Sequence, residues 1–298
     1  MSGLFSPFDP DGNEPKPRRF RSVPIRVLIP NLITLLAICI GLTAIRMGME
    51  GRMELAVYAV VVAAFLDGLD GRLARLLKGT SRFGAELDSL CDFVNFGVVP
   101  AVLLYIYTTS ELGSVGWAGS IVFAVAAALR LARFNVALDS PKPDYAQDFF
   151  TGVPAPVGAL LVMLPIYLGH LGSVNLPAVT ATVSLVYIVV IALLMVSRFP
   201  TWSFKKSTAR VSRDMVAPVF FIAVLFAAIL VSYTWETLTV SALIYLALLP
   251  VAYFNYKSRA RAHTAGLAAA AAPAEAGPDG EQDIRTPDDE TKDDLRLH

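Results

Sequence analysis

Long apolar segments alternate with short polar ones along most of the chain. They run approximately over residues 24–46, 54–76, 84–108, 116–138, 152–171, 176–197, 215–234 and 238–256. Each has close to the ~20 residues that an α-helix needs to cross the hydrocarbon core of a bilayer. The pattern predicts an all-α, polytopic integral membrane protein with about eight transmembrane helices embedded in a lipid bilayer.

The two ends of the chain lack this pattern. Residues 1–22 are polar and rich in Pro and Arg, and residues 258–298 become rich in Ala and Pro and then acidic. Segments of such composition bury too little apolar surface to fold on their own. We therefore expect a cytoplasmic N-terminal segment over residues 1–22 and a disordered cytoplasmic tail over residues 258–298.

The few charged residues are sorted between the connecting segments. Only 17% of the residues are charged and 55% are hydrophobic, which argues against a soluble domain. If both termini are cytoplasmic, the outward loops hold only Arg46 and Arg52, and the other Lys and Arg residues lie inward. This bias predicts a multi-pass protein of the inner membrane with cytoplasmic termini. Because the basic residues are divided among short loops, we expect no nucleic-acid partner.

A group of carboxylates interrupts the apolar pattern where the second and third segments face each other. It fits the frame D-x2-D-G-x2-A-R-x8-G-x3-D-x3-D, whose fixed positions are Asp67, Asp70, Gly71, Ala74, Arg75, Gly84, Asp88 and Asp92. Carboxylates beside hydrocarbon are costly to desolvate unless they pair with a cation or bind a metal. Their spacing is therefore the most informative feature of the sequence for function.

Helical geometry predicts that these carboxylates converge. Asp67 and Asp70 are three residues apart at the end of one helix, and Asp88 and Asp92 are four apart at the start of the next. Such pairs share a helix face, and Gly79 with its polar neighbours can turn the chain between the helices. If the helices pack antiparallel, the site offers oxygen ligands that suit Mg²⁺ or Mn²⁺, as one ion or two.

Glycine and arginine beside the carboxylates indicate phosphate chemistry. Gly71 and Gly84 fit places where the backbone approaches a ligand or a neighbouring helix. Arg75 can neutralise a carboxylate or bind a phosphate through two hydrogen bonds. The residues alone leave open ordinary juxtamembrane charges and a cation-transport path lined by acids. The acids lie at a membrane end and not at its midplane, which favours a metal site over transport.

The whole frame resembles the signature of the CDP-alcohol phosphatidyltransferases and shows no departure from it. The resemblance implies a six-helix catalytic core, here over residues 23–200, followed by two additional spans over residues 201–257. It also implies the metal-dependent transfer of a phosphatidyl group from a CDP-linked lipid to an alcohol, with release of CMP. A homodimer is a further expectation from the family.

The same resemblance implies roles for individual residues. Two divalent cations would be held by Asp67, Asp70, Asp88 and Asp92. Asp92 would also be the general base that deprotonates the alcohol. The nucleotide site would be lined by Asn31, Thr34, Gly71, Arg75 and Gly84. For Asn31 and Thr34 the residues alone also allow helix capping or interhelical hydrogen bonds.

Three segments resemble the branch of the family whose acceptor alcohol is L-serine. They are PNLIT in the first span, FFTGVPAPVGA before the fifth, and LRLARFN, which contains Arg130, Arg133 and Asn135. The serine carboxylate needs a fixed cation, which either arginine can supply, although arginine at a span end is also a common topological anchor. We expect CDP-diacylglycerol and L-serine as substrates, with choline, glycerol 3-phosphate or inositol as alternative acceptors.

Overall fold

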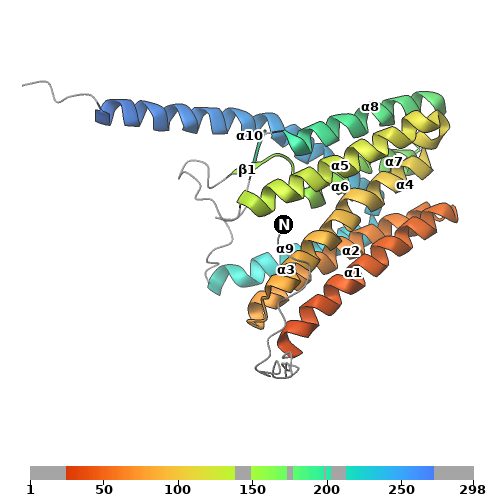
Figure 1. The fold of residues 1–298 in the computed structure, drawn as a ribbon, viewed down its shortest axis with the longest axis horizontal. Helices are drawn as coiled ribbons and strands as arrows, with labels where there is room; N and C mark the ends of the chain where they lie inside the picture. The colour runs from red at the N-terminus through yellow and green to blue at the C-terminus, as the bar shows by residue number, and fades with distance from the viewer. Residues whose placement is uncertain (1–24, 138–148, 173–176, 198, 203–212, 272–298) are drawn as a thin grey trace, which may run out of the picture.

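The computed structural model describes residues 25–137, 149–172, 177–197, 199–202 and 213–271. Within them the chain forms a bundle of long helices (Figure 1). The first part contains α1 (Ile25–Met49), α2 (Met53–Leu76), α3 (Arg82–Asp92), the π-helix η1 (Phe93–Val98), α4 (Val99–Tyr107), the 3₁₀ helix η2 (Thr109–Leu112) and α5 (Ser114–Ala137). The second part contains β1 (Phe149–Thr151), α6 (Ala155–Val162), α7 (Leu164–His170), α8 (Pro177–Val196), β2 (Pro200–Trp202), α9 (Arg213–Ser232) and α10 (Thr234–Ala271).

The helices follow the predicted apolar segments, and the all-α membrane fold is confirmed. The segment α3–η1–α4 is one continuous rod, and α6 and α7 are separated only by Met163. Among the described residues, four helical segments are long and apolar enough to span a membrane: Val27–Met49, Arg82–Tyr107, Ser114–Ala137 and Thr234–Ser258. Shorter apolar helices cover Ala155–His170, Thr180–Val196 and Phe220–Ser232. α2 adds a further long helix that carries charged residues in its last turns.

Small residues of α1 allow its neighbours to approach closely. Ala37 and Ala44 are completely buried, and a Cβ added at Gly48 would lie 2.7 Å from a methyl carbon of Leu103 on α4. Large apolar side chains instead face outward, for example Phe220 and Phe221 on α9. Close contact between small residues is how helices associate in lipid, where an outward apolar face needs no protein cover.

A short two-stranded antiparallel sheet was not predicted. β1 pairs with β2, with Phe149 opposite Trp202. Gly152, which directly follows β1, has a φ of 76°, and its N–H donates to the Phe199 carbonyl oxygen over 2.8 Å. A Cβ on Gly152 would lie 2.5 Å from the Met195 carbonyl oxygen, so only glycine fits this close approach. The pairing joins two distant loops, which is why no local sequence pattern signals it.

The last helix continues past the predicted boundary. We expected a disordered tail from residue 258 onward, but α10 extends to Ala271 and projects beyond the rest of the bundle (Figure 1). The added turns are rich in Ala and also contain Arg and Leu, which have high helix propensities. The predicted N-terminal segment 1–22 and the rest of the predicted tail, 272–298, lie outside the described residues.

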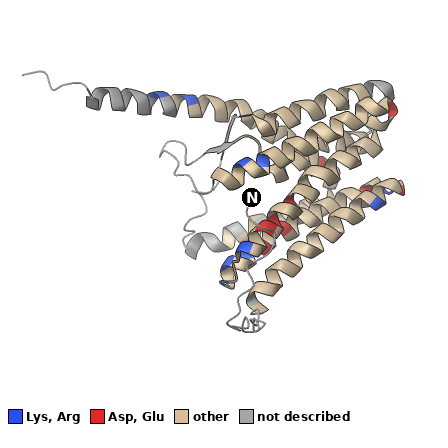
Figure 2. Cartoon of the chain, in the orientation of Figure 1, with Lys and Arg blue, Asp and Glu red and all other residues tan. Residues whose placement is uncertain are grey.

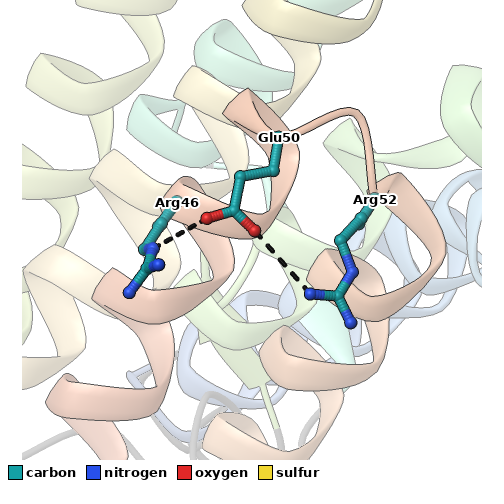
Figure 3. A network of polar contacts seen from close by, with 3 residues as sticks. All are labelled: Arg46, Glu50 and Arg52. Atoms are coloured by element: carbon teal, nitrogen blue, oxygen red, sulfur yellow. Dashed lines mark hydrogen bonds and ion pairs between the residues drawn. The ribbon is translucent and has the colours of Figure 1, made fainter.

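Charged side chains lie mainly at the two ends of the bundle. Figure 2 shows the acidic residues of α2 and α3 at one end, together with basic residues of the same helices and of α5. At the other end, Arg46 and Arg52 approach Glu50 from either side of the α1–α2 loop (Figure 3). The Arg46 Nε–Glu50 Oε1 distance is 2.8 Å and the Arg52 Nη1–Glu50 Oε2 distance is 3.7 Å. The only basic residues predicted for the outward loops thus share one carboxylate.

Candidate active site

A tight turn places the end of α2 beside the start of α3. Lys78 has a left-handed backbone with a φ of 50°, and the Gly79 N–H donates to the Ala74 carbonyl oxygen over 2.9 Å. Ser81 caps α3, because its Oγ accepts a hydrogen bond of 3.0 Å from the Gly84 N–H. We expected Gly79 to turn the chain; the residue with positive φ is its neighbour Lys78.

Three of the four aspartates come together. Asp67 of α2 and Asp88 and Asp92 of α3 each offer a carboxylate oxygen, and these oxygens all lie within 4.8 Å of one another. The three side chains are half-buried. Two consecutive helices thus bring these three carboxylates together, as the spacing predicts.

Asp70 lies at the edge of this group and is oriented by α1. It is 3% exposed, and its Oδ2 accepts a hydrogen bond from the Thr34 hydroxyl. Thr34 also donates to the Pro30 carbonyl oxygen at 3.1 Å, one turn back along α1. The family resemblance implies that Thr34 lines the nucleotide site, and in the structure its hydroxyl also bonds to one of the aspartates.

The carboxylates of the site lack cationic partners within the described residues. One oxygen each of Asp67, Asp70 and Asp92 is buried and has no hydrogen-bond partner within the described residues. In that part of the chain the ion pairs are those of Glu50, and none reaches the aspartates. Buried carboxylates close together are unstable without a compensating charge. A set of oxygen donors alone fits a hard divalent cation such as Mg²⁺ or Mn²⁺.

A cavity of about 330 Å³ adjoins the aspartates. Its wall is formed by α1, the end of α2, the turn and the start of α3, and it includes Asp70 and Asp88. The five residues predicted for the nucleotide site all line it: Asn31, Thr34, Gly71, Arg75 and Gly84. A polar ligand in this cavity would therefore contact the carboxylate group directly.

The two glycines of the frame serve different purposes. A Cβ added at Gly84 would lie 2.8 Å from the Asn31 Oδ1, so this glycine allows α1 to pack against α3. A Cβ added at Gly71 would meet nothing within 4 Å, so this glycine leaves the cavity open. Arg75 is exposed, and its Nε donates to the Gly71 carbonyl oxygen over 3.0 Å. This bond holds the guanidinium at the rim of the cavity.

The candidates for serine binding lie at the same end of the bundle but do not line this cavity. Arg130 is 5% exposed, and its Nε donates to the Val153 carbonyl oxygen over 3.2 Å. Arg133 donates from Nη1 to the Val196 carbonyl oxygen at 2.6 Å, where α8 ends. Asn135 donates from Nδ2 to Ser89 Oγ at 3.0 Å. Of the three, Asn135 alone is shown in contact with the helix that carries Asp88 and Asp92.

Sequence reasoning missed a buried polar residue close to the aspartates. Asn95 lies in η1, three residues after Asp92, and is 1% exposed. Neither its Oδ1 nor its Nδ2 has a hydrogen-bond partner within the described residues. The sequence does contain a signal for Asn95, because it is a polar residue within the apolar run FVNFGVVP. Polar residues inside membrane spans are usually functional.

Comparison with known families gives a match over most of the bundle. Residues 27–196 match the CDP-alcohol phosphatidyltransferase family. Residues 214–250, in α9 and α10, match a second family described as CDP-alcohol phosphatidyltransferase 2. The first match covers more than half of the chain and contains the entire aspartate frame.

Several curated proteins are similar to the chain. The CDP-diacylglycerol–serine O-phosphatidyltransferase of Mycobacterium bovis is 49% identical over 146 residues, which are 49% of this chain and 50% of that protein. The Helicobacter pylori protein of the same name is 40% identical over 179 residues, 60% of this chain and 73% of the relative. That of Methanocaldococcus jannaschii is 38% identical over 137 residues, 46% and 59% respectively. The match thus spans about half the length of the mycobacterial relative.

Proposed function

The chain belongs to the CDP-alcohol phosphatidyltransferase family, and we propose that it transfers a phosphatidyl group from CDP-diacylglycerol to L-serine, with release of CMP. The observation that carries the proposal is the convergence of Asp67, Asp88 and Asp92 beside a polar cavity. Serine as the acceptor is supported by the names of the bacterial and archaeal relatives.

In this proposal four aspartates hold two divalent cations, Mg²⁺ or Mn²⁺. Asp67, Asp88 and Asp92 contribute the clustered oxygens, and Asp70 contributes the carboxylate that Thr34 orients. When bound, the cations neutralise the carboxylates and stabilise negative charge on the phosphates and on the leaving CMP. The buried oxygens without partners support this assignment.

Asp92 is proposed as the general base. The serine hydroxyl oxygen attacks the phosphorus atom that carries the diacylglycerol, and the hydroxyl proton passes to the Asp92 carboxylate. The bond between this phosphorus and the bridging oxygen of CMP breaks, and CMP leaves with the bonding electrons. Asp92 suits this role because it is the last residue of α3, one turn beyond Asp88 where the helix continues into η1.

The cavity is proposed as the site of the cytidine nucleotide. Arg75 at its rim can donate charge-assisted hydrogen bonds to the pyrophosphate, and its bond to the Gly71 carbonyl oxygen restricts the guanidinium in advance. Asn31 offers amide donors and acceptors from the α1 wall. Gly71 leaves room for the ligand, since nothing lies within 4 Å of its missing side chain.

Arg130, Arg133 and Asn135 are proposed to bind serine at the inward end of α5. An arginine has five N–H donors, so one bond from each guanidinium to a backbone carbonyl leaves donors for the serine carboxylate. The bond from Asn135 to Ser89 supports a position of this helix end beside the aspartates.

We also propose the setting of the enzyme. The protein would lie in the inner membrane as a homodimer, with both termini and the active site on the cytoplasmic side. The gathering of basic residues at the aspartate end supports this orientation. Residues 23–200 would form the catalytic body and residues 201–257 the two additional spans. The site would open to the cytoplasm for serine and sideways to the bilayer for the lipid.

Release of CMP by the purified protein tests this function. The protein in detergent is incubated with CDP-diacylglycerol and Mn²⁺ or Mg²⁺, together with L-serine, choline, inositol, glycerol 3-phosphate or no alcohol. We expect release with L-serine only. Release with a different alcohol would change the assigned acceptor and leave the assigned reaction type unchanged. No release with any alcohol, from protein that binds Mn²⁺, would refute the transferase and favour a cation transporter.

A further inference from the structure

Asn95 occupies an unusual place in the helix that carries the aspartates. Residues Phe93–Val98 form a π-helix directly after Asp92, between the α-helical turns of α3 and α4. Such π-helical insertions are rare and occur frequently at functional sites. Asn95 lies within this turn and is 1% exposed. The irregular turn therefore presents a polar side chain to the interior of an apolar bundle.

The Asn95 amide lacks the partners that a buried polar group requires. Its Oδ1 and Nδ2 are both buried without a hydrogen-bond partner within the described chain. Leaving such a group unsatisfied is destabilising, and an apolar side chain of similar size would avoid this cost. Packing alone therefore does not explain an asparagine at this position.

Buried atoms without a hydrogen-bond partner within the described residues also occur on three of the aspartates. Asp92 precedes Asn95 by three residues, which is less than one turn of this helix. The Oδ1 atoms of Asp92 and Asp67 are likewise buried and unpartnered within the described residues. η1 also packs against both α1 and α2. A buried water typically makes about three hydrogen bonds to groups of this kind.

α1 contains a notch that accommodates the amide. A Cβ added at Gly41 would lie 2.1 Å from the Asn95 Oδ1 and 3.1 Å from its Cγ. No other side chain fits there unless the amide or the helix moves. Gly41 therefore fixes where the Asn95 amide lies, and α1 is the helix that also orients Asp70 through Thr34.

We propose that Asn95 is a positioning residue that holds a buried water against the Oδ1 atoms of Asp67 and Asp92. A carboxylate has about four lone-pair positions, so a hydrogen bond from water on one side leaves others for the cation. The water would fix the rotation of both carboxylates before the metal binds. The inference rests on the proposed function only in taking these aspartates as metal ligands.

Two substitutions of nearly equal shape separate hydrogen bonding from packing. Asn95→Thr keeps a hydroxyl group that can bind the water, whereas Asn95→Val removes all hydrogen bonding. The Mn²⁺ affinity of metal-free protein is measured by electron paramagnetic resonance, without substrates. We expect Asn95→Val to weaken Mn²⁺ binding about 10- to 100-fold, as is typical when a hydrogen-bond partner of a ligand is lost. Asn95→Thr should retain most of the affinity.

A second pair of variants tests the same inference if Asn95→Val does not fold. Gly41→Ala places a methyl group against the amide, whereas Gly48→Ala, two turns away on α1, meets a flexible Leu103 side chain at 2.7 Å. Gly41→Ala should weaken Mn²⁺ binding and Gly48→Ala should not. The double variant Gly41→Ala/Asn95→Val should lose no more affinity than Asn95→Val alone, because both act through one amide.

The outcomes separate this inference from the proposed reaction. Equal Mn²⁺ affinities for Asn95→Thr and Asn95→Val, whether high or low, would overturn the positioning role. Equal affinities for Gly41→Ala and Gly48→Ala would do the same. Wild-type protein that binds Mn²⁺ but releases no CMP would refute the reaction alone, since the affinity comparison requires no turnover.

Discussion

The two ends of the bundle differ in whether their charged side chains have partners. At the α1–α2 loop, Arg46 and Arg52 share the carboxylate of Glu50, and all three side chains are substantially exposed. At the other end, Asp67 and Asp92 each bury an oxygen without a partner in the described chain. Solvent and nearby opposite charges satisfy the first group, so it needs nothing more. The second group lacks such compensation and a bound cation would supply it, which distinguishes a functional site from ordinary surface charge.

Packing near the two ends differs in the same sense. At the end that contains the α1–α2 loop, the His170 ring stacks on Trp235 with a centroid distance of 4.1 Å and on Tyr107 with a centroid distance of 6.0 Å. Aromatic residues of this kind commonly mark the boundary between membrane and water. At the aspartate end, the glycines Gly71 and Gly84 leave space or allow close approach beside a cavity. Both ends contain a cavity, of about 360 Å³ beside Tyr107 and His170 and of about 330 Å³ beside Asp70 and Asp88, so what distinguishes the second is its carboxylates and not its volume.

The largest effect is expected from Asp92→Asn. The substitution removes the proposed proton acceptor, so turnover should fall about 10²- to 10⁴-fold, measured as CMP release with saturating L-serine. The thermal unfolding midpoint of the metal-free variant should equal or exceed that of the wild type, because a buried charge is removed. Turnover at the wild-type rate would overturn the assignment of Asp92 as the base.

A smaller effect is expected from Arg75→Ala. Loss of its charge-assisted hydrogen bonds to the pyrophosphate should lower kcat/KM for CDP-diacylglycerol about tenfold or more, mainly through KM. Arg72→Ala is the matched control, because Arg72 is an exposed residue of the same helix that does not line the cavity. Equal losses in the two variants would mean that Arg75 acts only through the general positive charge of the surface.

The smallest effect is expected at the α1–α2 loop. Glu50→Gln removes both ion pairs of the α1–α2 loop, yet exposed pairs contribute only ~1 kcal/mol or less to the free energy of unfolding. Thermal unfolding should therefore shift little, and CMP release should be unchanged. A marked loss of CMP release would contradict the separation between a structural end at the α1–α2 loop and a functional end at the aspartates.

Much of the site could be predicted from spacing because it depends on local geometry. Pairs three and four residues apart on consecutive helices are sufficient to bring Asp67, Asp88 and Asp92 together. The glycines and Arg75 lie within the same short stretch, so their place on the cavity follows from the same turn. The apolar segments similarly determine where the helices lie along the chain.

The remaining features depend on contacts that no local pattern encodes. The hydrogen bond from Thr34 draws Asp70 toward α1, across 36 positions of sequence. The pairing of β1 with β2 and the fit of Asn95 into the notch at Gly41 also join distant segments. For the same reason the sequence indicated that Arg130 and Arg133 lie at the inward end, but not that each would bond to a backbone carbonyl.

The most direct test of the account is the binding of Mn²⁺ to metal-free protein, followed in parallel with the recovery of CMP release. Wild-type protein should bind Mn²⁺ and regain activity over the same concentration range. Asp67→Asn and Asp88→Asn should weaken the binding strongly, while Glu50→Gln should bind as the wild type does. Full CMP release in the presence of excess chelator, or Mn²⁺ binding that is unaffected by both aspartate substitutions, would contradict the claim that these carboxylates hold the catalytic cation.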